Sequence, residues 1–287
     1  MDEKTMILTN YSFIIVALGT VFLAISAAIA GTVNVYKGQS LISDAIGHAS
    51  YPGIIFAFIV FQTRNPYLLL LGSFLSGMLC YQLIQWTHRY SKLHLDACLA
   101  IYLTGFFGLG MVLKSVIQGG RFHASQSGLE KYIFGQAAYM VEDDVKLIII
   151  IAFIVSVLFI LFKQKLIIYI FDYEFAFTHM IATSLMKNVI LIMTILTVSI
   201  GLKAVGAILI SSFMILPCIF ANQLSKKFNH VIILGILFST ISAFIGSYLS
   251  CLYSGLSTGP CIIIIMSVLT LLAIVFGKYG LIRGKQL

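Results

Sequence analysis

The sequence predicts an all-α protein made of several membrane-spanning helices. Of its 287 residues, 60% are hydrophobic and only 10% are charged, and the mean hydropathy is +1.04. A soluble domain carries about 25% charged residues, so this composition excludes an ordinary soluble enzyme and a disordered chain. Apolar runs of about 20 residues recur from Tyr11 to Phe276 without the alternation of β-barrel strands. Such runs favour helices, because backbone polar groups in lipid must be paired within the protein.

Nine apolar segments can be drawn along the chain. They are residues 11–33, 41–61, 66–87, 97–117, 146–162, 187–202, 205–223, 231–252 and 259–277. The sixth and seventh run together through Gly201, Lys203 and Gly206, so the alternative is one long helix and eight spans. The sequence shows neither a long linker nor a second domain. We therefore expect a single transmembrane domain over residues 1–287, with a cytoplasmic loop at 163–187.

The distribution of basic residues predicts the orientation of these spans. With nine spans and the N-terminus outside, the inner side holds Lys37, Arg89, Lys92, Lys163, Lys165, Lys187, Lys226, Lys227, Lys278, Arg283 and Lys285. The outer side holds fewer basic residues, and it collects the acids Glu130, Glu142, Asp143 and Asp144. Because basic residues favour the cytoplasmic side, we expect an outer N-terminus and a cytoplasmic C-terminus in a plasma membrane. The basic residues form no stripe, so the net charge of +8 does not indicate a nucleic-acid partner.

Asp44 is the most informative residue of the sequence. It lies at the start of the second apolar segment, where a carboxylate costs about 2.5–3.5 kcal/mol on insertion scales. His48 follows four residues later, so a helix places both side chains on one face. The pair suits Mn²⁺, Fe²⁺ or Zn²⁺, while a structural Asp–His hydrogen bond and a proton relay remain open alternatives. Two ligands do not complete a site, and a second copy across a symmetry axis would supply two more.

Proline and glycine near this pair predict an interrupted helix. Pro52 cannot donate a helical hydrogen bond and disfavours helical geometry at the residue before it, and Gly53 follows. Broken helices are common at transport sites, so this feature favours a substrate site. Pro217 predicts a kink in the seventh segment, where core packing is the expected role of Met214 and Cys218.

A second polar stretch lies between the fifth and sixth segments. Residues 170–180 (IFDYEFAFTHM) mix acids with aromatic side chains and are too polar to span a membrane. Two interpretations are open: a helix that lies in the membrane interface, or a short helix that docks in a groove of a cytoplasmic partner.

The chain lacks the common catalytic motifs. The patterns G-x-x-x-x-G-K-[ST], H-E-x-x-H and G-x-S-x-G are absent from the sequence. We therefore do not expect the chain to hydrolyse a nucleotide by itself, and no permanently bound cofactor is predicted. A membrane enzyme has little support, because catalytic groups do not cluster at one depth.

Several further motifs occur in a characteristic order. Residues 40–53 are similar to S-L-x-x-D-A-x-x-H-A-x-x-P-G, and residues 96–112 to D-x-A-I-G-x-x-F-x-x-x-F-A-L-G. Residues 129–135 resemble L-x-x-x-L-F-G, and residues 171–176 match F-D-P-E-F-A except at Tyr173. Residues 204–209 match A-V-G-x-I-L, and Leu216 precedes Pro217 where a threonine is usual. Taken together from residue 11 to 277, the chain resembles the membrane permeases of ATP-binding-cassette importers for manganese, zinc and iron.

The resemblance implies a function and a set of partners. In such importers two permeases, identical or paralogous, pair within the lipid of the membrane. Two cytoplasmic ATPases drive them, and an extracellular metal-binding lipoprotein delivers the ion. The resemblance implies that Asp44 and His48 line the ion site. It also implies that the ATPase-coupling residues are Phe171, Asp172, Glu174, Phe175 and Ala176.

We therefore expect the permease subunit of a bacterial importer that carries Mn²⁺, with Zn²⁺ or Fe²⁺ as alternatives. The competing class is a proton-coupled secondary metal transporter, in which Asp44 and His48 would form a proton relay.

Overall fold

The computed structural model describes residues 11–63, 65–117, 135, 137, 140–207, 209–253 and 255–282. Within these ranges all the regular elements are helices, which confirms the predicted all-α class. In order they are α2 (Tyr11–Tyr36), α3 (Ile42–Phe61), α4 (Pro66–Tyr90), α5 (Leu95–Val116), α7 (Glu142–Phe171), α8 (Tyr173–Thr178), α9 (Thr183–Ala204), α10 (Ile210–Leu224), α11 (Phe228–Leu252) and α12 (Thr258–Phe276).

Each of the nine predicted segments corresponds to one helix. In the described part of the chain, eight helices are long and apolar enough to cross a bilayer, and α10 is a shorter apolar helix of 15 residues. α9 and α10 are separate helices, so the long fused helix of the alternative does not form. Gly206 has a φ of 93°, a conformation that glycine adopts readily and a continuing helix excludes.

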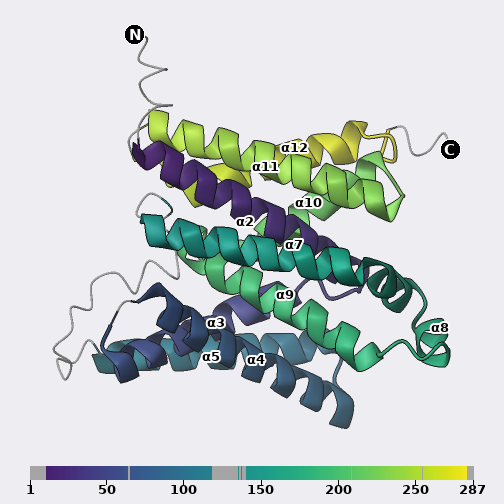
Figure 1. The fold of residues 1–287 in the computed structure, drawn as a ribbon, viewed down its shortest axis with the longest axis horizontal. Helices are drawn as coiled ribbons and strands as arrows, with labels where there is room; N and C mark the ends of the chain where they lie inside the picture. Colours follow the sequence, from purple (N-terminus) through teal and green to yellow (C-terminus); the bar gives the residue numbers. More distant parts are fainter. Residues whose placement is uncertain are drawn as a thin grey trace.

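Aromatic contacts show which helix ends lie together. The ring of Tyr36, at the end of α2, lies 5.4 Å from that of Phe171 at the end of α7 and 5.3 Å from that of Phe228 at the start of α11. The N–H of Tyr279, just after α12, donates to the carbonyl of Gln223 near the end of α10 (2.9 Å). These ends gather on the side of the bundle that carries α8 (Figure 1). We call this side the α8 end, and the charge distribution predicts it to be cytoplasmic.

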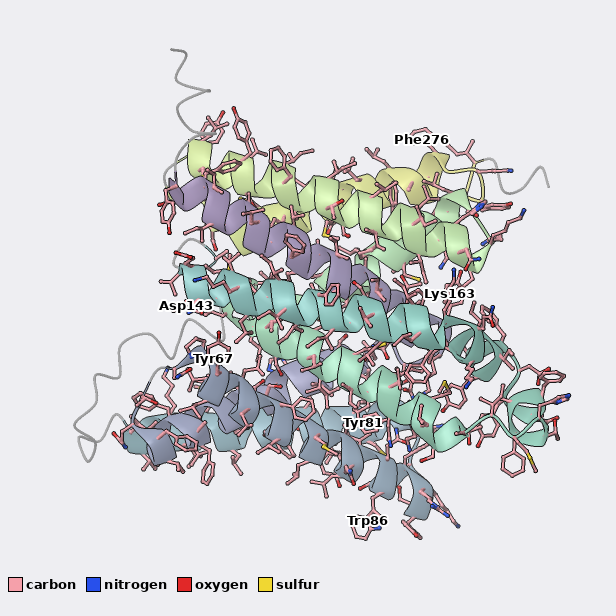
Figure 2. All side chains as sticks on the ribbon, in the orientation of Figure 1. Tyr67, Tyr81, Trp86, Asp143, Lys163 and Phe276 are labelled. Atoms are coloured by element: carbon pink, nitrogen blue, oxygen red, sulfur yellow. The ribbon has the colours of Figure 1, made fainter. Side chains whose placement is uncertain are left out.

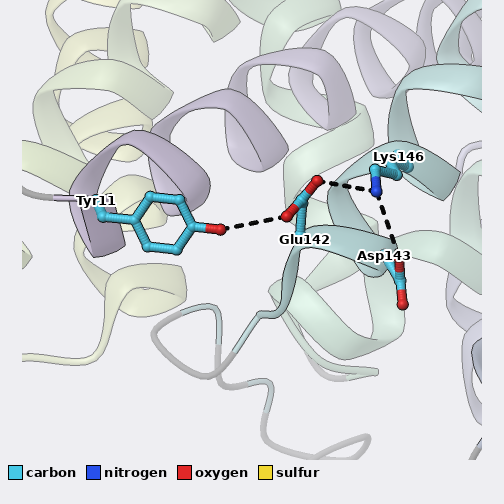
Figure 3. A network of polar contacts seen from close by, with 4 residues as sticks. All are labelled: Tyr11, Glu142, Asp143 and Lys146. Carbon is cyan, nitrogen blue, oxygen red and sulfur yellow. Dashed lines mark hydrogen bonds and ion pairs between the residues drawn. The ribbon is translucent and has the colours of Figure 1, made fainter.

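Charged side chains mark the two ends of the bundle. Figure 2 shows Lys163 near the α8 end and Asp143 near the opposite end. At that opposite end, the Tyr11 hydroxyl donates to Glu142 (3.3 Å), and Lys146 Nζ lies 2.9 Å from Glu142 and 3.6 Å from Asp143 (Figure 3). Because these charges are exposed and solvent screens them, the pairs contribute little to stability.

Asp144 behaves differently from the neighbouring acids. Its carboxylate is buried, accepts a hydrogen bond from the N–H of Val141 (2.9 Å) and pairs with Lys203 at the end of α9. The exposed acids at this end of the bundle, among the described residues, are therefore Glu142 and Asp143, while Asp144 fastens α7 to α9.

The predicted loop at 163–187 is shorter than expected. α7 continues to Phe171 and α9 begins at Thr183, so only residues 172–182 connect the two long helices. The 30 residues of α7 extend about 45 Å, beyond the roughly 30 Å of a hydrocarbon core. The prediction ended this span at the first lysine, whereas the helix continues into the interface.

Close approaches between backbones hold the helices in register. α3 and α4 meet where a Cβ on Gly53 would collide with the carbonyl oxygen of Gly72. The Ser76 hydroxyl of α4 donates to the Ala49 carbonyl of α3 beside this contact (2.6 Å). Small residues of this kind let membrane helices approach closely and exchange hydrogen bonds. The candidate metal-binding helix, α3, is therefore fixed along one side by α4.

Gly53→Ala is expected to destabilise the fold, because the new methyl group meets backbone that cannot move aside. Overpacking of this kind costs about 1–3 kcal/mol. The matched control is Gly105→Ala on α5, where a Cβ meets open space. Thermal unfolding of the purified variants in detergent should show a lowered midpoint for Gly53→Ala only; equal midpoints would contradict the packing described.

Candidate metal site

The side chains of Asp44 and His48 meet on one face of α3, as predicted. His48 Nε2 lies 3.7 Å from Asp44 Oδ1 across one helical turn. A metal with ligand bonds near 2.1 Å and tetrahedral angles separates its ligand atoms by about 3.4 Å. The observed separation is longer than a hydrogen bond and close to that value, so the pair is spaced as two ligands of one ion.

Two neighbouring helices hold the pair in place. The ring of Phe107 on α5 packs edge-to-face against the imidazole, with 5.0 Å between centroids. Ser211, in the first turn of α10, lies close to the Asp44 carboxylate. His48 Nδ1 is buried and lacks a hydrogen-bond partner among the described residues. In the tautomer protonated at Nδ1, Nε2 keeps its lone pair and faces Asp44, so Nε2 is the nitrogen that could bind an ion shared with the carboxylate.

The site is open on one side. The His48 side chain is 14% exposed and the Asp44 side chain 33%. Groups of three or more His, Cys, Asp and Glu side chains that could hold an ion are absent from the part of the chain that the structure describes. A single chain therefore contributes two protein ligands and leaves the remaining positions of an ion unfilled.

The start of α3 favours an ionised carboxylate at this place. Asp44 stands in the first turn of α3, and Leu41, the N-cap residue, provides no side-chain cap. The unpaired N–H groups and the helix dipole make this end partly positive, which favours a negative side chain. The dipole and the Ser211 hydroxyl thus offset part of the cost of burying Asp44.

The neighbours also fix the depth of the site. Phe107 lies 12 residues from the start of α5 (107 − 95), and Ser211 lies 13 residues from the end of α10 (224 − 211). Both of these helix ends lie at the α8 end, where the Tyr36 hydroxyl donates to Asn222 near the end of α10 (2.6 Å). The helix α3 itself begins deeper, because Ile42 lines a small pocket with Tyr81 of α4 and Ile190 of α9. At 1.5 Å per residue the site is about 18–20 Å from that end. In a hydrocarbon core of about 30 Å, this is close to the middle of the membrane.

The predicted interruption at Pro52 and Gly53 is wrong, because α3 continues through both residues from Ile42 to Phe61. Gly110 of α5 lies against Pro52 and Gly72 of α4 lies against Gly53, so packing on two sides holds the helix. α10 likewise continues through Pro217. Neighbouring helices make such prolines tolerable in membrane spans. Pro52 still deprives the His48 carbonyl of its helical donor.

The predicted coupling residues differ in what they contact and in how exposed they are. The Asp172 side chain caps α8 by accepting a hydrogen bond from the N–H of Phe175 (2.9 Å). Phe171 packs on Tyr36, and Ala176 is fully buried. Glu174 is exposed, and Phe175 is 43% exposed and stacks on His179. Phe171 (57% exposed) and Asp172 are exposed as well, so Ala176 is the member of the set that a partner cannot reach. Glu174 and Phe175 are the exposed members that neither cap α8 nor pack on Tyr36.

Other predictions at the sequence level have mixed outcomes. Met214 and Cys218 are fully buried, as core residues would be. The motif at 129–135 lies mostly outside the described residues. Phe107 was missed, and Ser211 was not connected with Asp44, because contacts between distant helices leave no local signal in the sequence.

A group of cations lies beside the turn that leads into α3. Lys37 Nζ stands 5.3 Å from the centroid of the Tyr169 ring, and Lys187 Nζ stands 5.7 Å from that of Tyr81. Burial, and to a lesser extent the charge of Lys187, lowers the pKa of Lys37 to about 8. The short connection before the candidate metal site therefore contains a lysine whose positive charge is costly to keep because it is poorly solvated.

Comparisons with known proteins all point to membrane proteins of metal transport systems. Residues 10–277 match the model of a family described as the ABC 3 transport family. The "Zinc transport system membrane protein TroC" of Treponema pallidum (strain Nichols) is 33% identical over 277 residues, 96% of this chain and 93% of that protein. The "Manganese transport system membrane protein MntC" of Bacillus subtilis (strain 168) is 33% identical over 91% of this chain, which spans 60% of that protein.

A solved structure has the same fold. It is described as "PsaBC from Streptococcus pneumoniae in complex with Fab" and matches with a TM-score of 0.86. The match covers 98% of this chain and 97% of that chain at 20% sequence identity. At this identity the match shows the arrangement of the helices.

Lys37→Met is expected to stabilise the protein at pH 7 by on the order of 1–2 kcal/mol, because it removes a poorly solvated charge. Between pH 8 and 10.5 the unfolded chain binds more protons at Lys37 than the folded chain does, so the lysine's cost falls as pH rises through this window. The advantage of Lys37→Met should therefore shrink towards pH 10.5. Thermal unfolding in detergent across this range measures it, with the exposed Lys165→Met as control. A variant less stable than the parent at pH 7 would contradict the assignment.

Proposed function

The chain belongs to the ABC 3 transport family, and we propose that it carries a divalent transition-metal ion into a bacterial cell. It is a permease subunit of a metal ABC transporter and a multi-pass protein of the bacterial plasma membrane. The observation that carries the proposal is the Asp44–His48 pair, which is spaced for one ion at mid-depth and open on one side. Mn²⁺ is the favoured ion because of the chain's resemblance to manganese permeases. Zn²⁺ and Fe²⁺ remain alternatives, because a site of carboxylate and imidazole without thiolate suits all three ions.

The proposed ion site is completed by a second permease. One chain provides one carboxylate and one imidazole, and a second copy related by a two-fold axis provides the same two groups. Two Asp44 carboxylates neutralise one divalent cation, so the loaded site carries no net charge within the membrane. A paralogous permease with equivalent residues would serve equally. An ion held by four such ligands, without a thiolate, is bound weakly enough to leave.

The proposed energy source is a pair of separate ATPase subunits at the α8 end. Glu174 and Phe175 are exposed on a short helix that is tied to α7 through Asp172 and to α9 by the chain. ATP binding that draws two ATPases together would pull on both α8 helices and rock the two permeases. An extracellular metal-binding lipoprotein would deliver the ion at the opposite end, where Glu142 and Asp143 are exposed.

Asp44→Asn is expected to reduce uptake of radioactive Mn²⁺ in cells to background, because it preserves side-chain size and removes the charge that binds the ion. The matched control is Asp96→Asn, which alters an acid in the first turn of α5. Membrane abundance should stay normal in both variants. Undiminished uptake by Asp44→Asn would end the assignment of the ion site.

Two further measurements separate the alternatives. Elemental analysis of the purified, loaded complex identifies the ion, and loss of that ion in Asp44→Asn is expected. Uptake driven by a pH gradient in vesicles without an ATPase would contradict the proposal and favour a proton-coupled transporter.

Replacing both Glu174 and Phe175 with alanine is expected to abolish copurification of the ATPase while leaving metal binding intact. The exposed side chains of α8 would provide the contact, whereas the Asp44–His48 pair lies about 20 Å away. The control replaces His88 and Tyr90, which are exposed near the end of α4 at the same side of the bundle. Retained ATPase in the α8 variant would contradict the coupling role.

A further inference from the structure

A groove runs along the surface between α7 and α11. Figure 1 shows α2 between these two helices, and both of them pack on it. The groove has a volume of about 270 Å³. Its floor is formed by Ile25 and Ile29 of α2, and its walls by residues of α7 (Ser156, Phe159, Ile160) and α11 (Ile232, Ile233, Ile236). We call it the α7–α11 groove.

The lining of the groove is almost entirely apolar. Apart from its end, Ser156 is the one polar residue among those that line it, and the Ser156 hydroxyl donates to the Ala152 carbonyl of its own helix (2.7 Å). Ile160 is 69% exposed and Ile233 is 56% exposed, so the walls continue into an apolar outer surface. An apolar hollow of this kind does not hold water. Hydrocarbon is therefore its natural content, and the membrane supplies hydrocarbon as the acyl chains of phospholipids.

Two polar side chains close the groove at the α8 end. They are Lys163 of α7 and Asn229, in the first turn of α11. Lys163 lies 21 residues after the start of α7 (163 − 142), which corresponds to about 32 Å along the helix. A hydrocarbon core is about 30 Å thick, so the ammonium group lies at the level of the lipid headgroups. Figure 2 shows Lys163 at this end of α7.

The charge at this end favours an anion. The ion pairs found within the described residues do not include Lys163, and the residues that line the groove include no carboxylate. Lys165, Lys226 and Lys227 lie close in sequence to the two polar groups. The Lys163 ammonium is thus a cation beside an apolar groove without an acidic partner in the described part of the chain. Basic pockets between membrane helices on the cytoplasmic side favour anionic headgroups.

We propose that the α7–α11 groove binds an anionic phospholipid of the cytoplasmic leaflet. One acyl chain lies along the isoleucines of α2 and α11, and the phosphate lies between Lys163 Nζ and the Asn229 side chain. The lipid thereby connects α7 to α11 about two turns before α7 reaches the connection to α8. This assignment is independent of which ion the protein carries.

A tryptophan reporter can measure this binding directly. The sequence has one tryptophan, Trp86 on α4, which does not line the groove. The double variant Trp86→Phe/Ile233→Trp therefore carries a single fluorophore in the groove wall. The full-length variant is placed in phosphatidylcholine vesicles, and quenching by brominated phosphatidylglycerol is compared with quenching by brominated phosphatidylcholine. We expect an about fivefold preference for the anionic lipid, the scale of one lysine at a membrane surface.

Matched lysine variants locate the preference. Lys163→Gln in the reporter background should bring the two lipids to nearly equal affinity. Lys165→Gln should keep the preference, because side chains two positions apart do not share a helix face. Equal affinity in the reporter protein overturns the proposal. Equal losses in the two lysine variants also overturn it, since they would show a general surface potential in place of a site.

Mass spectrometry of the intact complex provides a test that does not depend on the reporter. The natural chain, purified from detergent with equal amounts of phosphatidylglycerol and phosphatidylcholine, should retain the anionic lipid, and Lys163→Gln should lose that selectivity. Retention of both lipids alike by the natural chain would overturn the proposal.

Discussion

A carboxylate at the middle of an apolar bundle is the constraint on which this structure depends. Asp44 costs about 2.5–3.5 kcal/mol to place there on insertion scales, so the protein must compensate it. Two features offset this cost. Asp44 stands in the first turn of α3, where unpaired backbone N–H groups make the helix end partly positive, and the Ser211 hydroxyl lies close to the carboxylate. His48 then stands one turn away at a distance suited to a shared ion. The unfilled part of this arrangement is what a divalent cation and a second copy would provide.

The packing around α3 follows from the need to hold this pair still. Gly53 lets α4 approach along one side, and Gly110 lets α5 approach Pro52 on another. Helix α3 therefore remains continuous although its sequence contains a proline in the middle. Phe107 and Ser211, brought in by α5 and α10, then limit the movement of the imidazole and the carboxylate. The rigidity of the site is a property of four helices, although both proposed ligands come from one.

The same turn that begins α3 also contacts the α8 end. Tyr36 packs against Phe171, and Lys37 lies over the Tyr169 ring, so the end of α7 touches the connection just before Asp44. Tyr169 in turn packs against Tyr173, the first residue of α8. A movement of α8 can thus pass through α7 and this connection towards the candidate metal site. The pocket for the lipid proposed on α7 lies on the outer side of this same helix.

The sequence by itself determined the features that depend on local order. Long apolar runs gave the nine helices, and a spacing of four residues put Asp44 and His48 on one face, because helical periodicity is written in neighbouring residues. Only the tertiary structure decided that α3 continues through Pro52, that α7 extends past Lys163, and that Phe107 and Ser211 meet the pair. These outcomes depend on contacts between residues far apart in the chain. The depth of Asp44 in the bundle likewise depends on such distant contacts, because it is set by where α5 and α10 pack against α3.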